Sequence, residues 1–400
     1  MGFLEGVRVA SFTTSVAGPN AARVLAACGA EVIKIESHHG GLDNFRFFGT
    51  TTDLNVAPRF IESNLNVLSA LINLKDPTGI RLTKELIAKS DVVLDNFRPD
   101  VMNRLGLGPD QLRAVKPELI VCRMPGLGLS GPKHWYGTWG STLTAFSGMT
   151  YMWNHPDQLR PIGAQGVYPD YIAAAMIPAT IIAALIRRRL TGEGATIEIA
   201  QIEATAYMLG TTFLDAAVNR REPRPTGNDW PYAAPHNCYP CLGEDRWVVI
   251  AVESDEQWRA LAGALDRSDL ARDPRYQTLA ARRKRLNEID ELVSAWTRRR
   301  EAHSVMHQLQ QAGVPCGVVQ SGEDLFHDLH LRERGFIGGV EHPTLGHVPL
   351  PIVPLHISDG GVEPLRCSDM LGAHTEYVIC DLLGYSKEQL EEWRAAEILN

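Results

Sequence analysis

The sequence has no excess of positive charge and little that indicates a membrane protein. Its 39 Lys and Arg residues are outnumbered by 47 Asp and Glu residues, which gives a formal net charge of −8. Nucleic-acid binding and polybasic membrane binding both depend on positive charge, so we expect neither partner. An apolar stretch at residues 172–186 contains Pro178 and is shorter than the roughly 20 residues that span a bilayer. We therefore expect a buried core helix there.

Cysteine is sparse, and its pattern excludes a disulfide framework. The seven cysteines are scattered and odd in number, which is typical of a protein in the reducing cytoplasm. Cys238 and Cys241 have the spacing of half a zinc or redox site, but no second such pair follows. The first residues lack the pattern of a signal peptide. We expect a cytoplasmic protein with no metal site and no permanently bound cofactor.

Several motifs of well-known catalytic sites are also missing. The sequence contains no GxSxG, no HExxH, no Walker A lysine and no GxGxxG fingerprint. Serine-hydrolase, zinc-protease, P-loop and standard dinucleotide-binding chemistry are therefore unsupported. A local basic cluster at residues 282–285 and 298–300 is typical of a solvated helix face, with an anion-attracting rim as the alternative.

What is present is an ordinary globular composition in which strand and helix patterns alternate. The 400 residues are 44% hydrophobic and 22% charged, enough for a large core and two domains. The pattern predicts strands at residues 7–12, 31–36, 91–95, 119–123 and 195–200, and helices that include residues 77–89, 109–115, 171–190 and 201–218. Such alternation predicts an α/β fold with a parallel sheet covered by helices.

The pattern changes after residue 218, where an Arg-, Pro- and Gly-rich linker begins. A strand at residues 246–252 and helical patterns to about residue 312 predict a smaller α+β domain. We expect residues 1–220 to form the first part of a large domain, residues 225–325 the small domain, and residues 326–400 to complete the large one. Two final helices are predicted at residues 374–383 and 386–396, the second with capping-box spacing at Ser386 and Gln389.

Asp170 stands where residues 166–169 lead into the long apolar helix. An Asp at such a junction is most commonly an N-cap that accepts a backbone N–H bond. The position also suits a nucleophilic carboxylate, because a helix N-terminus favours its ionised form and directs N–H donors at anions formed nearby. The residues alone leave both interpretations open.

Two other segments have the composition of a nucleotide site. Asn96, Phe97 and Arg98 follow a predicted strand, with Arg104 further along. Open α/β sheets bind ligands at the carboxyl ends of their strands, and a ring face beside two cations suits an adenine nucleotide with phosphates. The turn at residues 15–19 precedes a helix whose free N–H groups can meet a phosphate, with close packing at Gly18 as the alternative. The Gly-rich residues 125–132 predict a loop that moves over a site.

Together these segments resemble the class III CoA transferases, the CaiB/BaiF family. Each piece alone is weakly specific, but their joint order is highly specific and covers nearly the whole chain. The matching segments are residues 4–9, 17–19, 29–36, 96–99, 104–107 and 127–132, the Asp170 segment, and residues 191–194, 313–315, 334–336, 342–343, 372–375 and 382–385.

The resemblance implies a Rossmann-like large domain, a small domain and a dimer of two interlocked subunits. It aligns Asp170 with the family's nucleophilic aspartate, which would carry CoA as an aspartyl thioester between half-reactions. An acyl-CoA donor and a free carboxylic acid would be the substrates, with succinyl-CoA and an aromatic or branched dicarboxylic acid as candidates. The CoA-binding residues would be Val16, Ala17, Lys75, Asn96, Phe97, Arg98 and Arg104.

Four positions depart from the family pattern. Val67 and Leu68 follow Asn66 where many members have Lys and Arg, Ser37 stands in place of a basic residue, and Thr138 aligns with a lysine of some members. Fewer cations should weaken the electrostatic capture of CoA phosphates. The losses also allow a subunit that works beside a related but different one.

Two alternatives to a homodimeric transferase stay open. The family includes α-methylacyl-CoA racemases, which pair the aspartate with a histidine upstream. The corresponding residues 136–141 contain no histidine, although His134 lies close by. The chain could also be a non-catalytic subunit of a heteromeric CoA transferase.

Overall fold

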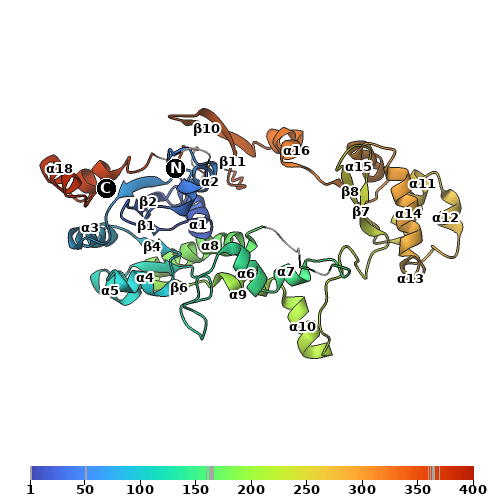
Figure 1. The fold of residues 1–400 in the computed structure, drawn as a ribbon, viewed down its shortest axis with the longest axis horizontal. Helices are drawn as coiled ribbons and strands as arrows, with labels where there is room; N and C mark the ends of the chain where they lie inside the picture. The colour runs from blue at the N-terminus through green and yellow to red at the C-terminus, as the bar shows by residue number, and fades with distance from the viewer. Residues whose placement is uncertain are drawn as a thin grey trace. The chain divides into compact units, whose positions relative to one another are not determined.

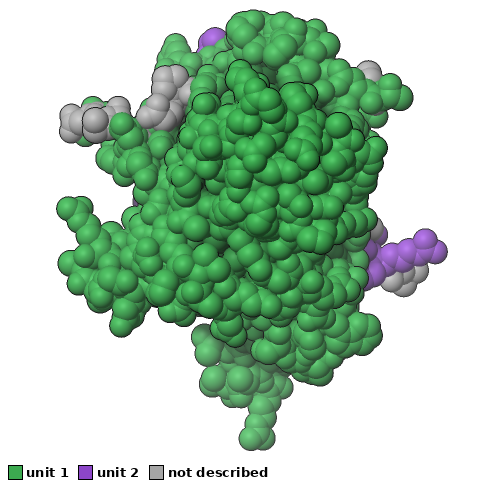
Figure 2. Space-filling model, turned by 90° about the vertical axis from the view of Figure 1, so that its left-hand side faces the viewer, with its two compact units in different colours: residues 1–150, 164–222, 330–400 green, residues 151–163, 223–329 purple. Residues whose placement is uncertain are grey.

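The structure is a computed structural model. It describes residues 2–49, 52–158, 160–161, 166–358, 360, 362, 365–368 and 370–400. The chain divides into two units (Figure 2): residues 1–150, 164–222 and 330–400 form the first, and residues 151–163 and 223–329 form the second.

The first unit is built on a six-stranded parallel sheet. Its spatial order is β3 (Leu68–Leu71), β2 (Glu31–Glu36), β1 (Arg8–Phe12), β4 (Val92–Asp95), β5 (Ile120–Arg123) and β6 (Ala195–Glu198). This is the order of doubly wound nucleotide-binding folds, in which the direction of strand addition reverses between β1 and β4. The predicted α/β fold with a parallel sheet is confirmed. Strand β3 was not among the strands predicted from the sequence.

Helices cover both faces of this sheet (Figure 1). Val9 and Val32 pack on one face with α1 (Ala17–Ala27) and α8 (Tyr168–Thr191). Ala10 and Ile33 face the other side, because successive strand residues alternate, and pack with α3 (Pro77–Ala88) and α5 (Pro109–Val115). Coverage of both faces explains why the strands are apolar almost throughout.

The C-terminal segment packs in the second of these cores. Val378 and Ile379 of the π-helix η2 (Tyr377–Leu382) and Leu390 of α18 (Lys387–Ala395) lie against it. The predicted capping box is confirmed: Ser386 Oγ accepts the Gln389 N–H at 3.3 Å, and Gln389 Oε1 accepts the Ser386 N–H at 3.1 Å.

Helix α8 is a core helix that starts earlier than expected. Its N-cap is Val167, so Asp170 lies within the first turn, and the interpretation of Asp170 as an N-cap is wrong. Pro169 occupies an early position where a missing N–H costs nothing. By length and composition α8 could cross a membrane, a test that core helices of soluble proteins also pass. Its inner face is buried against the sheet, as at Ala173 and Ile177.

The helix predicted at residues 201–218 is two helices, so that prediction is wrong in detail. α9 (Gln201–Tyr207) ends before Met208, and α10 (Gly210–Asn219) begins two residues later. Gly210 lowers the helix propensity at the break.

The second unit combines a three-stranded antiparallel sheet with helices. The strands are β7 (His236–Pro240), β8 (Trp247–Ala251) and β9 (Cys316–Val318), and the helices are α11 (Asp255–Ala264), α12 (Ser268–Arg272), α13 (Leu279–Arg283), α14 (Leu286–Thr297) and α15 (Ala302–Gln311). Cys238 and Cys241 are free thiols. Arg282 of the basic cluster is fully buried and donates to the Ala234 carbonyl at 2.9 Å, so this residue does not belong to a solvated face.

Short elements complete the described chain. They are η1 (Asn44–Phe47), α2 (Pro58–Ser63), α4 (Pro99–Arg104), α6 (Gly140–Phe146), α7 (Met149–Met152), α16 (Gly322–His327), α17 (Leu329–Glu333) and the hairpin of β10 (Ile337–His342) and β11 (Gly346–Pro351).

Candidate active site

A cavity of about 820 Å³ opens in the first unit at the carboxyl ends of the parallel strands. Thr13, Ser37, Ile72 and Asn96, which follow β1, β2, β3 and β4, all line it. The cavity therefore lies at the point where the strand order reverses, the usual ligand site of such sheets. Its volume is within the range of roughly 300–1,000 Å³ that holds cofactor-sized ligands.

Most of the residues expected at a CoA site lie around this cavity. Lys75, Asn96, Phe97, Arg98 and Arg104 line it together with Asp170. Val16 and Ala17 are instead buried at the start of α1 and are not among the described lining residues. Gly126, from the Gly-rich loop at residues 125–132, also lines the cavity.

Asp170 is a buried carboxyl with an unused acceptor. Its side chain lines the cavity although the residue is only 8% exposed. Burial raises its pKa to about 6, and hydrogen bonding from the backbone N–H groups of Asp170 and Ala17 opposes that rise. Within the described chain, no group donates a hydrogen bond to the buried Oδ2. With a pKa of about 6 the carboxyl is mostly ionised near neutral pH, which is the form that could act as a nucleophile.

Two glycines of the cavity wall allow close approach of the chain, Gly140 to this carboxyl and Gly126 to Thr138. A Cβ atom at Gly140 would lie 2.0 Å from Asp170 Oδ2, and one at Gly126 would lie 2.0 Å from Thr138 Oγ1. Both contacts are far shorter than real Cβ contacts, so a side chain at either position would displace its neighbour. The sequence pattern did not single out Gly140, because its role depends on an approach between distant segments.

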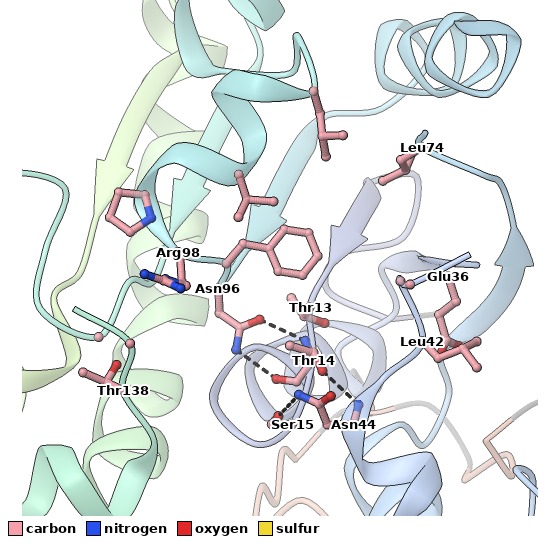
Figure 3. A pocket seen from close by; sticks show the side chains of 18 of the residues that line it. Thr13, Thr14, Ser15, Glu36, Leu42, Asn44, Leu74, Asn96, Arg98 and Thr138 are labelled. Atoms are coloured by element: carbon pink, nitrogen blue, oxygen red, sulfur yellow. Dashed lines mark hydrogen bonds between the residues drawn. The ribbon is translucent and has the colours of Figure 1, made fainter. Parts of the chain in front are cut away.

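The Asn96 side chain is directed at the protein rather than left free for a ligand. Its Oδ1 accepts the Thr14 N–H at 2.9 Å, and its Nδ2 donates to the Thr14 carbonyl at 2.9 Å (Figure 3). Asn96 therefore ties the end of β4 to the turn after β1. Both polar groups of the Asn96 amide, a residue expected to bind CoA, are thus engaged by the backbone of this turn.

Arg98 lies at the cavity with its guanidinium exposed (Figure 3). Its Nη2 donates to the Trp135 carbonyl at 2.7 Å and so ties down the segment that carries residues 134–140. The neighbouring Gly-rich loop is tied by Glu198, whose Oε1 accepts the Leu129 N–H at 2.6 Å.

A buried network beside the cavity was not foreseen from the sequence. Lys34 Nζ and Asp43 Oδ2 lie 2.6 Å apart with side chains 1% and 0% exposed, and Glu36 pairs with Arg46 at 2.7 Å. Alternation along β2 could have shown that Lys34 and Glu36 point into the interior. Their partners come from an irregular segment that has no pattern.

The described residues contain no group of three or more His, Cys, Asp or Glu side chains placed to hold a metal ion. The side chains that line the cavity include two carboxylates, three cations and three aromatic rings: Glu36 and Asp170, Lys75, Arg98 and Arg104, and Phe97, Tyr136 and Trp139.

Comparison with known proteins places this site in a family. The model of CoA-transferase family III matches residues 4–375. The chain is 32% identical to a succinyl-CoA–D-citramalate CoA-transferase of Chloroflexus aurantiacus over 99% of this chain and 98% of the relative. It is 31% identical to the alpha subunit of a succinyl-CoA–L-malate CoA-transferase of Chloroflexus aurantiacus, over 99% of this chain and 92% of the relative.

Solved structures agree. A CaiB/BaiF family protein from Brucella suis superimposes with a TM-score of 0.86 at 26% identity, covering 95% of this chain and 99% of the other. The resemblance noted in the sequence is confirmed, and the chain belongs to CoA-transferase family III.

Proposed function

We propose that this protein transfers CoA from succinyl-CoA to a carboxylic acid through a covalent intermediate on Asp170. The observation that carries the proposal is a buried carboxyl at the cavity, Asp170, whose Oδ2 has no hydrogen-bond donor in the described chain. The named transferases among its relatives take CoA from succinyl-CoA and give it to citramalate, malate or glutarate, which supports the donor.

The first half-reaction begins with attack of the Asp170 carboxylate on the thioester carbonyl of the donor. The C–S bond breaks, giving a mixed anhydride and CoA thiolate. The thiolate then attacks the aspartyl carbonyl of the anhydride, and the donor acid leaves as a carboxylate. Asp170 is left as a CoA thioester, and the balance of atoms and charge needs no cofactor.

The second half-reaction reverses these steps with the acceptor. Its carboxylate attacks the aspartyl thioester and again releases CoA thiolate, which attacks the acyl carbonyl of the new anhydride. The new acyl-CoA leaves and the Asp170 carboxylate is restored. The backbone N–H groups at the start of α8 would stabilise the oxyanions that form beside Asp170.

For CoA itself, we place the nucleotide end against Phe97 and the cations of Lys75, Arg98 and Arg104. All four line the cavity that also contains Asp170. The pantetheine arm would then run through the cavity toward the carboxylate, past the start of α1, where Val16 and Ala17 lie.

For the acceptor, we propose a dicarboxylic acid with a branched or aromatic substituent. The named acceptors of the relatives are dicarboxylic acids. The exposed rings of Tyr136 and Trp139, both at the cavity, supply apolar surface for a substituent.

The protein is proposed to work as a dimer of identical chains, or as a heteromer with a related subunit. Helix α10 buries none of its residues in the described chain, and it exposes Phe213 and Leu214 at 58% and 63%. Leu190, at the end of α8, is 80% exposed. Large exposed apolar side chains such as the neighbouring Phe213 and Leu214 are typical of a surface that a partner covers. A reducing cytoplasm suits the free cysteines.

The racemase alternative has one observation in its favour. His134 lines the same cavity as Asp170, although its Nδ1 lies 2.7 Å from the Gly131 carbonyl oxygen. Racemisation would exchange the α-proton of an acyl-CoA without any acceptor acid. Incubation in deuterium oxide with a 2-methylacyl-CoA, analysed by mass spectrometry, separates the two; deuterium uptake without acceptor would favour the racemase.

The decisive experiment is mass spectrometry of the intact protein incubated with succinyl-CoA. We expect an adduct of CoA on the peptide that contains Asp170, and its replacement by a hydroxamate after hydroxylamine. Asp170→Asn should form no adduct. Asp110→Asn is the matched control, because Pro109 and Asp110 open α5 as Pro169 and Asp170 open α8, but Asp110 is exposed away from the cavity. A wild-type protein that turns over substrate without any adduct would refute the proposal.

A further inference from the structure

The turn between β1 and α1 has an unusual backbone conformation. Ser15 has φ of 65°, in the left-handed region that residues other than glycine seldom adopt. Such a residue keeps this conformation only where surrounding contacts fix it. Thr14 and Ser15 line the cavity, and the helix that follows begins at Ala17 (Figure 3). The contacts that hold this turn therefore determine where α1 begins.

Asp43 supplies two of those contacts from a fully buried position, and Asn44 and Asn96 supply others. Its Oδ1 accepts the Ser15 N–H at 2.8 Å and the Thr14 hydroxyl at 3.3 Å. The same oxygen accepts the Phe45 N–H at 2.9 Å, which fixes the carboxylate to its own segment. Asn96 holds the other side of the turn through its two bonds to the Thr14 backbone.

Lys34 offsets the free-energy cost of burying the Asp43 carboxylate. Its Nζ donates to Asp43 Oδ2 at 2.6 Å and to the Thr13 carbonyl at 2.8 Å. A buried carboxylate without a partner would be strongly destabilising, whereas a paired and hydrogen-bonded one is accepted. Lys34 therefore neutralises Asp43 and holds the residue before Thr14 as well.

The turn sets the position of the first N–H group of α1, the helix that packs against α8 and its Asp170. Ala17 is the first residue of α1, so its N–H has no partner inside its own helix. That N–H and the N–H of Asp170 itself are the donors that oppose the effect of burial on Asp170. Both are backbone groups, so their direction depends on how the backbone is held.

We propose that Asp43 is a positioning residue: through Thr14 and Ser15 it fixes the start of α1, so that the Ala17 N–H is directed at the carboxylate of Asp170. The inference rests on the proposed role of Asp170 as the nucleophile. The titratable groups around this arrangement are Tyr171 on α8, the Lys34–Asp43 pair and the adjacent Glu36–Arg46 pair.

The test is the pH dependence of adduct formation in a single turnover with succinyl-CoA. Asp43→Asn keeps the shape of the side chain but removes the charge that Lys34 pairs with. The acid limb of the pH profile is the range in which the rate rises as Asp170 ionises. The Ala17 N–H stabilises the ionised form of Asp170, so a less firmly held Ala17 should move this limb to higher pH by roughly half to one unit. Thr14→Val loses one of the Asp43 contacts and should move the limb in the same direction by less.

Asp91→Asn is the matched control. Asp91 precedes β4 at the amino-terminal ends of the parallel strands, opposite to the cavity, where its carboxylate accepts the Arg8 N–H at 2.8 Å and pairs with Arg188 at 2.8 Å. Its acid limb should coincide with that of the wild type. If Asp43→Asn forms the adduct more slowly but keeps the acid limb of the wild type, Asp43 has only a structural role and the proposal is overturned. If Asp43→Asn does not fold, the limb of Thr14→Val decides. Wild-type protein that forms no adduct at any pH would instead remove the proposed function.

Discussion

Gly140 lies so close to Asp170 that a Cβ atom at position 140 would be 2.0 Å from Asp170 Oδ2. The same atom would be 2.6 Å from the Cβ of Val167, the N-cap of α8. Gly140 opens α6 and Asp170 lies in the first turn of α8, so the N-terminal ends of two helices meet at this contact. Glycine is needed here because the backbone approaches the Asp170 carboxyl so closely.

Gly140→Ala should therefore displace the carboxylate and impair catalysis more than folding. A misplacement of about 1 Å at a reacting group can cost about 100-fold in rate, and we expect a loss of that order in the transfer rate. Steady-state kinetics together with a melting curve would measure both effects. Gly263→Ala within α11 is the control, since no described atom lies within 4 Å of its Cβ position. Full activity in Gly140→Ala would contradict the packing argument.

The acidity of Asp170 should set the pH dependence of the enzyme. Burial raises its pKa to about 6, and only the ionised form is a nucleophile. We expect kcat/KM to rise with pH through an acid limb near pH 6 and to level off above pH 7. A limb near pH 4 would mean that water or substrate solvates the carboxylate in the working enzyme.

The same pKa shift has a consequence for stability whose sign can be worked out. The folded-state pKa of about 6 exceeds the ordinary value of 3.8, so folding favours the protonated form. Stability from this group is therefore present below pH 4 and is lost as pH rises through 6. Asparagine at position 170 carries no charge to bury, so Asp170→Asn should raise the free energy of unfolding at pH 7 by up to about 3 kcal/mol. Urea unfolding at pH 4 and pH 7 measures this, and an equal effect at both would contradict it.

Local patterns predicted much of this fold, because each strand and helix has its own periodicity. The alternation at residues 31–36 and the Gly-Pro pair at residues 18–19 marked β2 and the start of α1 without further information. The capping box at Ser386 and Gln389 was also readable, since both partners lie three residues apart. The parallel sheet followed from the alternation itself.

What could not be predicted depends on residues that are distant in sequence. The approach of Gly140 to Asp170, and the support that Asp43 gives to Ser15, join segments 30 and 28 residues apart through irregular backbone. Val16 and Ala17 were expected at the ligand from the resemblance, yet the fold buries them beneath the turn. Periodicity does not show how loops pack.

The buried pair of Glu36 and Arg46 should dominate the stability of this region. Arg46 Nε and Nη2 donate to the two carboxylate oxygens at 2.8 and 2.7 Å, and the guanidinium lies 3.6 Å from the Phe60 ring centroid. Arg46→Met leaves a buried carboxylate unpaired and should cost about 3–5 kcal/mol in unfolding free energy. Arg394→Met breaks the exposed pair with Glu391 and should cost less than about 1 kcal/mol. Similar values for the two variants in denaturant titrations would contradict the argument.

The cations at the cavity should act on CoA through its phosphates. Arg104 is exposed at the end of α4 and lines the cavity, and neither Ser37 nor Thr138 supplies a charge nearby. Arg104→Gln should raise the KM for succinyl-CoA about five- to tenfold, because one charge-assisted bond to phosphate is lost. The dependence of KM on salt should also become shallower, since exposed charges are screened. Arg113→Gln on α5 changes an exposed arginine away from the cavity and should alter neither. Initial rates at low and high salt measure both quantities, and a change in kcat with KM unaltered would assign Arg104 to the chemical step instead.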